Sequence, residues 1–278
     1  ISNNNLITSI NIQQSVTNVL PSLRYTLAIS KTNRLTLNYT TNSSLPSVSQ
    51  LQPVQDNTNT NRITIGNPDL IPTYSHSGNI NYSIFKTVSN QSLSIGVTQS
   101  ITQNAFGSSV VYDEFGRMIT QTINTDGNSS TAVNLRAATD IYKSILKMSF
   151  NAQFRDARFN NYVNLEQNKT VNESYLGGLG LQLLKDSIEI SLNGNINYTV
   201  PKTSINPESN KPYFTNFYSL KIDWTLLWRL RLNSTLTYTI NSKRTDGYNI
   251  NFLIWNVGLD KYFGERERWS AGVVVYDI

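Results

Sequence analysis

Alternation of apolar and polar residues is the feature that most restricts how this chain can fold. In the stretch 187–200, SIEISLNGNINYTV, the even positions from 188 to 198 are isoleucine, leucine, glycine or tyrosine. The odd positions between them are polar: Glu189, Ser191, Asn193, Asn195 and Asn197. A period of two places the two sets on opposite faces of a β-strand. In a soluble sheet the apolar face meets a protein core, whereas in a membrane barrel it meets lipid and the polar face lines a wet lumen.

The same alternation returns along the whole chain. We predict about twelve strands, many of them ten residues or longer, and no helix with a period of 3.6 residues. Strands of soluble proteins are usually about 5–6 residues long, so the longer strands predicted here favour a membrane barrel. The clearest apolar rows lie at 23–29, 35–39, 80–84, 93–97, 146–154, 179–183, 218–224 and 230–240.

Short and long connections alternate between these rows. The short ones are predicted at 30–33, 86–90, 140–143, 185–187, 225–228 and 262–267. Most connections between them are longer and polar, at 41–73, at about 105–116, in the polar stretch before Leu179, and at 201–212. Asp126–Gly127 is interpreted as a bulge, because a hairpin there would upset this order. Short periplasmic turns and longer external loops are typical of outer-membrane barrels.

Aromatic residues gather near the predicted strand ends, where Trp and Tyr favour the boundary between membrane and water. They are Tyr198, Tyr213, Phe214, Phe217, Trp224, Trp228, Tyr248, Tyr262, Phe263 and Trp269. Only 15% of the residues are charged, against about 25% in soluble domains. No apolar run approaches 18 residues, which excludes a membrane helix but not a barrel, whose strands need about 9–11 residues. The sequence therefore predicts an all-β, antiparallel transmembrane barrel.

Residues for catalysis or metal binding are scarce. His76 is the only histidine and there is no cysteine, so a Ser-His-Asp triad or a zinc site is not expected. The glycines of LGGLGLQ (176–182) are interpreted as small residues packed closely in a strand. DEFG (113–116) is interpreted as a solvated loop tip, with calcium binding the weaker alternative. We predict no catalytic, cofactor-binding or metal residues and no enzyme activity.

Charged residues on the polar faces are the candidate lining of a lumen. They are Glu189, Lys221, Asp223 and Arg231, which either contact a solute or plug, or form the ordinary wet lining of a barrel. The net charge of +5 is spread along the chain without a dense basic stripe. This pattern fits anionic lipid or lipopolysaccharide and gives little support for nucleic acid as a partner.

Five stretches carry a resemblance to a known family. In order they are LPSLRY (20–25), LPSVSQLQP (45–53), GNPDLIPTYSH (66–76), WNVGLDKYF (255–263) and VVVYDI (273–278). Together they resemble the C-terminal barrel of the outer-membrane β-barrel family of Bacteroidota that is related to TonB-dependent receptors. The resemblance implies that residues 1–278 are part of a larger barrel of about 22 strands in the bacterial outer membrane. It also implies a plug domain and further strands outside this chain, and the plug would contact the TonB complex.

Three functions remain open at this point. The first is the barrel segment of a gated transporter that binds a solute and passes it through the lumen, without covalent chemistry. The second is a structural or secretion-associated barrel that scaffolds surface partners, including a surface lipoprotein. The third is a secreted β-rich adhesin or carbohydrate-binding module, which would tolerate polar groups at Ile190, Leu220 or Leu236.

Overall fold

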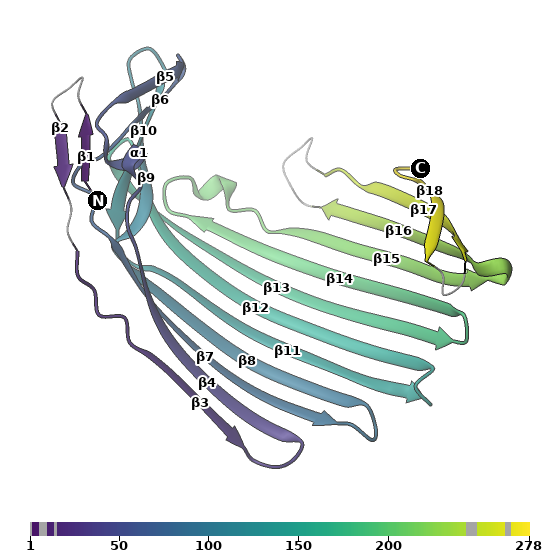
Figure 1. The fold of residues 1–278 in the computed structure, drawn as a ribbon. Coiled ribbons are helices and arrows are strands. Elements are labelled where there is room, and N and C mark those ends of the chain that lie inside the picture. Colours follow the sequence, from purple (N-terminus) through teal and green to yellow (C-terminus); the bar gives the residue numbers. More distant parts are fainter. Residues whose placement is uncertain (1, 6–9, 14–15, 243–248, 265–267) are drawn as a thin grey trace.

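The computed structural model describes the chain except for residues 1, 6–9, 14–15, 243–248 and 265–267. Twelve of its strands follow one another across a single antiparallel path (Figure 1). They are β3 (Ser22–Ala28), β4 (Asn33–Ser44), β7 (Thr73–Lys86), β8 (Gln91–Gln103), β11 (Asn128–Tyr142), β12 (Leu146–Val163), β13 (Glu166–Lys185), β14 (Ile188–Thr203), β15 (Tyr213–Leu226), β16 (Leu230–Ser242), β17 (Phe252–Phe263) and β18 (Trp269–Val275). The predicted count of about twelve strands and the all-β fold class are confirmed.

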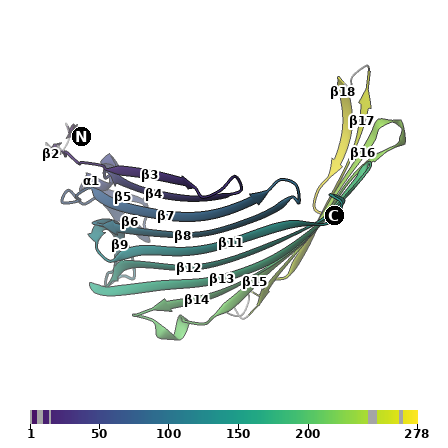
Figure 2. The same ribbon diagram turned by 90° about the horizontal axis from the view of Figure 1, so that it is seen from below.

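The twelve strands form a curved wall that does not close on itself. β3 and β18 are the two ends of the path, and Figure 2 shows the wall bending between them. The twelve strands lie side by side in the order in which they follow one another along the chain, so the wall is a meander. No helix in the described residues is long and apolar enough to cross a membrane.

Six short connections lie at one end of the wall and overlap the six places predicted from the sequence, although residues 265–267 of the last one lie outside the described residues. They join β3 to β4, β7 to β8, β11 to β12, β13 to β14, β15 to β16 and β17 to β18. Several contain residues with positive φ, as tight turns require: Asn90 at 47°, Ser144 at 60° and Asp186 at 50°. At the β15–β16 turn a short 3-10 helix, η2 (Leu227–Arg229), places Trp228 at a φ of 61°. We assign this end to the periplasmic side because short turns are found there in outer-membrane barrels.

The opposite, external end carries a second layer of strands. β9 (Ala105–Tyr112) and β10 (Met118–Thr125) form a hairpin that extends from β8 and β11. β5 (Gln55–Asn59) and β6 (Arg62–Ile65) form another hairpin, and β6 pairs in parallel with β10. β9 in turn pairs in parallel with the tip of β12, so this layer is joined to the wall. A separate N-terminal hairpin consists of β1 (Ser2–Asn5) and β2 (Ile10–Gln13).

A small apolar core holds the external layer together. A one-turn helix, α1 (Val48–Leu51), begins with a capping box in which Ser47 accepts a hydrogen bond from the Gln50 backbone. Leu51 and Leu70 are almost fully buried, and Ile63 in β6 and Ala105 in β9 are also buried. The side-chain amide of Asn67 donates to the carbonyl of Thr122 at 3.1 Å, which ties the segment before β7 to β10.

Four sequence predictions about loops need correction. The stretch 41–73 is not a loose polar loop, because it contains the end of β4, then α1, β5 and β6, with a buried core. The prediction of no helix is wrong for the one-turn helix α1. The predicted loop at 105–116 is mainly the strand β9. The polar stretch before Leu179 is also strand, and only Asn164 and Leu165, with φ of 49° and 69°, turn the chain between β12 and β13.

Two further boundaries follow from the strand bounds. Asp126–Gly127 lies between β10 and β11 and faces the break between β8 and β9, so the prediction that it is not a hairpin is confirmed. β17 begins at Phe252. Tyr248, one of the aromatic residues predicted for a strand end, lies outside the described residues. The predicted loop 201–212 begins within the last residues of β14 and contains a short 3-10 helix, η1 (Pro207–Ser209).

Candidate functional site

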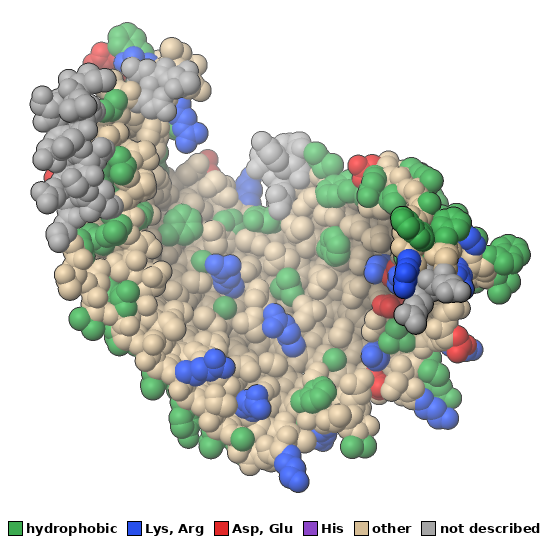
Figure 3. Space-filling model, viewed as in Figure 1, with side chains coloured by type: hydrophobic (Ala, Val, Ile, Leu, Met, Phe, Trp, Pro, Cys, Tyr) green, Lys and Arg blue, Asp and Glu red, His purple; other side chains and the backbone are tan. Residues whose placement is uncertain are grey.

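The hollowed face of the wall is polar. Figure 3 shows a concave surface made mainly of neutral polar side chains and backbone, with scattered Lys and Arg. The registers of β11 to β15 place the odd residues of β14 on the same face as Asn134, Gln153 and Ser219. This face therefore carries the asparagines of the stretch 187–200, as the alternation predicted.

Hydrogen bonds between strands order these polar side chains. Gln153 donates to Asn134 Oδ1 at 2.6 Å, and Ser94 donates to the Asn81 side chain at 2.8 Å. The Asn151 amide donates to Asn195 Oδ1 at 3.4 Å across Gly178. These bonds satisfy amide groups that face the lumen, so the lining is a connected polar surface.

Two glycines of the LGGLGLQ segment make this network possible. A Cβ at Gly178 would lie 2.1 Å from Asn195 Oδ1 and 2.5 Å from Asn151 Oδ1. A Cβ at Gly180 would lie 2.5 Å from Ser149 Oγ and 2.7 Å from Asn193 Oδ1. The prediction of close packing is confirmed for Gly178 and Gly180, since side chains from both neighbouring strands occupy the space above them. It is wrong for Gly177, where nothing lies within 4 Å of the position that a Cβ would take.

The four charged residues predicted to line the lumen lie on one face near the periplasmic end. Lys221 Nζ is 2.7 Å from Asp223 Oδ2, and Gln182 donates to Glu189 Oε1 at 2.8 Å. Glu189 pairs in register with Asp223, and Arg231 pairs with Asp260. Lys221 therefore neutralises Asp223 and an amide binds Glu189, whereas Arg231 lies opposite Asp260 without an ion pair among the described residues.

Four further arginines on the same face have no ion pair among the described residues. Arg24, Arg34, Arg136 and Arg155 are exposed and lie towards the β3–β12 half of the wall. Register places Arg24 and Arg34 on the polar faces of β3 and β4, and Arg136 and Arg155 on those of β11 and β12. These four residues were not among the lumen residues predicted from the sequence, although the alternation alone assigns them to this face.

The other face of the wall is apolar and exposed. One row across six strands contains Met148, Leu181, Leu192, Leu220, Leu236 and Trp255. In β14, Ile188 and Tyr198 mark the two ends of this apolar band. Ten residues at about 3.3 Å each, tilted by about 40°, span roughly 25 Å, which is the height of the apolar band in known barrels.

Aromatic rings line the external edge of this band. Ring centroids are 5.1 Å apart between Phe154 and Tyr175, 6.3 Å between Tyr175 and Tyr198, and 4.6 Å between Tyr198 and Phe214. Trp224 lies on the same apolar face near the periplasmic end. An aromatic row at the external end of an apolar band and a tryptophan at the other end fit the pattern expected at the two membrane–water interfaces.

Not every aromatic residue predicted for the interface lies on the membrane side. Register places Tyr213, Phe217 and Tyr262 on the same face as the polar residues Lys221 and Asp260. These three predictions are wrong because nearness to a strand end does not fix the face, which alternates with each residue.

Charged residues return on the outer face beyond the aromatic row. Asp156 and Glu173 follow Phe154 and Tyr175 by one step of the alternation. Arg158 Nε is 2.7 Å from Asp156 Oδ1, and Lys202 Nζ is 2.5 Å from Glu173 Oε1. The change from apolar to ionic side chains places the upper limit of the hydrocarbon region at the aromatic row.

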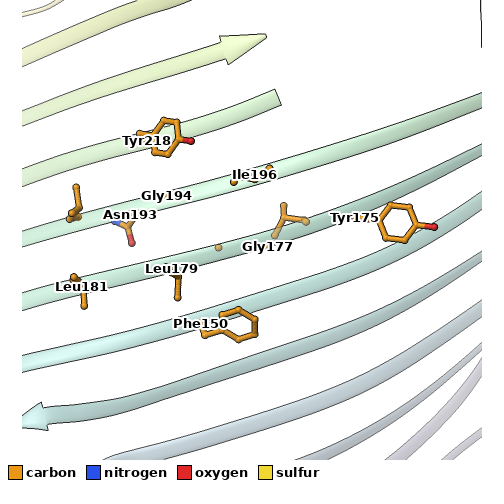
Figure 4. A pocket seen from close by; sticks show the side chains of 12 residues that line it. Phe150, Tyr175, Gly177, Leu179, Leu181, Asn193, Gly194, Ile196 and Tyr218 are labelled. Atoms are coloured by element: carbon orange, nitrogen blue, oxygen red, sulfur yellow. The ribbon is translucent and has the colours of Figure 1, made fainter. Parts of the chain in front are cut away.

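An apolar groove is hollowed into the outer face just below that row. It has a volume of about 740 Å³ and lies on β12 to β15 (Figure 4). Its floor includes Gly177 and Gly194, and its walls include Phe150, Tyr175, Ile196 and Tyr218. The groove therefore faces lipid and does not open into the polar lumen.

The two remaining candidate sites in the sequence have structural roles. The Tyr39 hydroxyl and His76 Nδ1 are 2.7 Å apart, and the ring of Tyr74 meets His76 edge-on at 4.9 Å, so the histidine joins β4 to β7. Asp113 holds the β9–β10 turn, where its carboxylate accepts hydrogen bonds from the backbone N–H groups of Phe115 and Arg117. In the described ranges no three His, Cys, Asp or Glu residues lie together as metal ligands would.

The wall, its polar lumen face and its lipid-facing band define a transmembrane β-barrel protein. The model of the Outer membrane protein beta-barrel family matches residues 1–217, which is more than half of the chain. The chain belongs to this family, and its place is the bacterial outer membrane. No curated protein matches the chain.

Proposed function

We propose that this chain is the barrel segment of a TonB-dependent-receptor-like transporter of Bacteroidota, which binds a solute and passes it through a gated lumen. The observation that carries the proposal is a wall of twelve strands that is still open. A barrel of about eight strands is filled by its own side chains, whereas barrels of 16–18 strands leave a channel and those of 22 hold a plug. The barrel completed from this wall belongs to the wide class.

The open edges support further strands outside the chain. Backbone N–H and C=O groups at β3 and β18 would otherwise face lipid without partners, at a cost of several kcal/mol for each group. We propose that residues 1–278 are the C-terminal part of the barrel and that the same protein supplies the remaining strands and a plug. The TonB complex would move that plug, and neither a cofactor nor covalent chemistry takes part.

The external layer is the proposed surface for solute capture. Its strands β5, β6, β9 and β10 lie beyond the aromatic row and are held by the Leu51–Leu70 core. The connection around η1, between β14 and β15, lies at the same end of the wall. An ordered layer suits capture because less conformational entropy is lost when a solute binds to groups that are already positioned.

The test uses the full-length native protein in its own cells. Deletion of the gene is expected to abolish uptake of at least one solute from a panel of metal chelates, oligosaccharides and peptides, and a protonophore should reduce that uptake to the same level. Purified full-length protein should bind the same solute. Unchanged uptake of the whole panel, with no binding by the purified protein, contradicts the proposal.

The second candidate is a barrel that scaffolds surface partners. The external layer favours it as well, because a folded platform with its own core can hold a surface lipoprotein. This function predicts that a lipoprotein co-purifies with the full-length protein while uptake does not depend on the gene. Finding a plug domain with a TonB box upstream in the full-length protein would favour the transporter over the scaffold. The outer-membrane family disfavours the third possibility, a secreted module.

A further inference from the structure

We propose that the outer face of β12 to β14 is a binding site for one lipopolysaccharide molecule. Arg158 and Lys202 would hold its phosphate groups, and the groove over Gly177 and Gly194 would hold one acyl chain. The inference rests on the position of the wall in the outer membrane and not on the proposed transport function.

The groove has the form of a slot for a hydrocarbon chain. Its lining is almost entirely apolar, and Tyr175 stands at its external end while Leu181 and Leu192 stand at the deeper end. Tyr175 and Leu181 are six residues apart in β13, about 20 Å along the strand, or roughly 15 Å of depth at a 40° tilt. Half of a hydrocarbon core of about 30 Å is also about 15 Å, so the groove is one leaflet deep.

Missing side chains at two glycines create the slot. Nothing lies within 4 Å of the position that a Cβ would take at Gly177, and only the ring of Tyr218 approaches that position at Gly194. Gly177 pairs in register with Ile196, so the two glycines lie diagonally on neighbouring strands. Lipid chains surround the wall at this depth, and they fill such a hollow by dispersion contacts.

The cations above the groove are arranged to face an anionic headgroup. The side chains of Arg158 and Lys202 are 60% and 52% exposed, whereas their partners Asp156 and Glu173 are only 13% and 23% exposed. The carboxylates thus lie beneath the cations and fix their positions. Arg158 and Lys202 flank Val171 on the two neighbouring strands, about 10 Å apart at a strand spacing of about 4.8 Å.

The apolar groove and the cations above it are continuous, as a ligand with both an acyl chain and phosphate groups requires. Glu173 lies one alternation step beyond Tyr175, so the ion pairs begin where the groove ends. Lys169 lies two such steps further on the same face of β13 and is a third exposed cation. Unlike Arg158 and Lys202, it has no ion pair among the described residues. These groups lie at the external end of the wall, in the leaflet formed by lipopolysaccharide. Phosphates suit Arg and Lys through charge-assisted hydrogen bonds.

The test measures lipopolysaccharide retained by the full-length protein. The protein is purified in detergent from outer membranes, and bound lipid is counted by native mass spectrometry and by titration with lipopolysaccharide from the same membranes. Gly177→Leu fills the groove, and Gly78→Leu is the matched control, because Gly78 is also on the outer face with nothing within 4 Å. We expect about a tenfold loss of affinity in Gly177→Leu, corresponding to about 1.4 kcal/mol, and less than a twofold change in the control.

The headgroup is tested separately with both ion pairs neutralised. A variant with Asp156→Asn, Arg158→Gln, Glu173→Gln and Lys202→Gln leaves no unpaired charge behind, and we expect it to bind intact lipopolysaccharide no better than the wild type binds dephosphorylated lipopolysaccharide. Heat-dependent migration in gels verifies folding of each variant. Equal retention by Gly177→Leu and Gly78→Leu overturns the proposal. Competition by phosphatidylglycerol vesicles as strong as that by lipopolysaccharide also overturns it, because the site would then be a general phospholipid site.

Discussion

Asn151 and Asn195 meet across Gly178: the amide of Asn151 donates to the side-chain oxygen of Asn195 at 3.4 Å, directly above a residue without a side chain. The three residues lie on consecutive strands, β12, β13 and β14, and are paired in register. A polar contact across the middle strand therefore depends on glycine. The lumen lining is in this respect a packed surface, in which the size of each residue is limited by its two neighbours.

The first prediction concerns this close packing. Gly178→Ala should lower the free energy of unfolding by about 1–3 kcal/mol, because the added methyl group overlaps both asparagine side chains. Gly177→Ala is the matched control, since its Cβ meets open space on the lipid side. Urea unfolding of the full-length protein in lipid vesicles measures the difference. Equal stability of the two variants would show that the asparagine contact does not restrict the lining.

The second prediction concerns the two faces of the wall. Leu220→Arg should destabilise the barrel by about 2–4 kcal/mol, because Leu220 belongs to the apolar row near the middle of the membrane. Ser219→Arg should have little effect, since its side chain faces the wet lumen. The same unfolding measurement in vesicles compares them. A larger cost for the serine variant would reverse the assignment of the faces.

The third prediction concerns the core of the external layer. Leu51 is 1% exposed, so Leu51→Ala should cost about 2–5 kcal/mol of local stability. We expect faster proteolysis of segment 45–73 and unchanged heat-dependent migration of the barrel, because the core belongs to the layer and not to the wall. Val54→Ala, at a position that is 48% exposed, is the control. Loss of barrel migration in the leucine variant would instead make this core part of the wall's stability.

The fourth prediction concerns the pH dependence of the β9–β10 turn. Desolvation raises the pKa of the Asp113 carboxyl, but hydrogen bonds from Arg117 and Phe115 and the charge of Arg117 together lower it, and the net pKa lies below the usual value. A lowered pKa means that the carboxylate stabilises the turn above its unfolded pKa of about 4, and that this stability is lost as the pH falls through the folded pKa.

Hydrogen exchange of the Phe115 and Arg117 amides measures this effect after correction for the intrinsic exchange rates. Protection should fall on acidification in the wild type, since both amides donate to the Asp113 carboxylate. Asp113→Asn should show low protection at neutral pH and no further change. The same acid-induced loss in both proteins would assign the effect to another group.

Much of the wall could be predicted from the sequence because its causes are local. Side chains alternate across a strand at every residue, so Ile188 and Glu189 are assigned to opposite faces without knowledge of any neighbour. Turn chemistry is local as well, and all six short connections were found. The same reasoning failed for Tyr213 and Phe217, where the type of residue was given more weight than the parity of its position.

The external layer and the groove depend on contacts between distant segments. Leu70 is buried and Asn67 is bonded to Thr122 only because α1, β6 and β10 come together from different parts of the chain. Their sequence reads as a polar loop because a core of a few residues leaves no periodic pattern. Likewise, Gly177 and Gly194 form one hollow only in the register in which Gly177 pairs with Ile196. The sequence by itself determined which residues face lipid and which face the lumen, while the tertiary structure decided which of them are neighbours, because strand register and loop packing arise from pairings between separate segments.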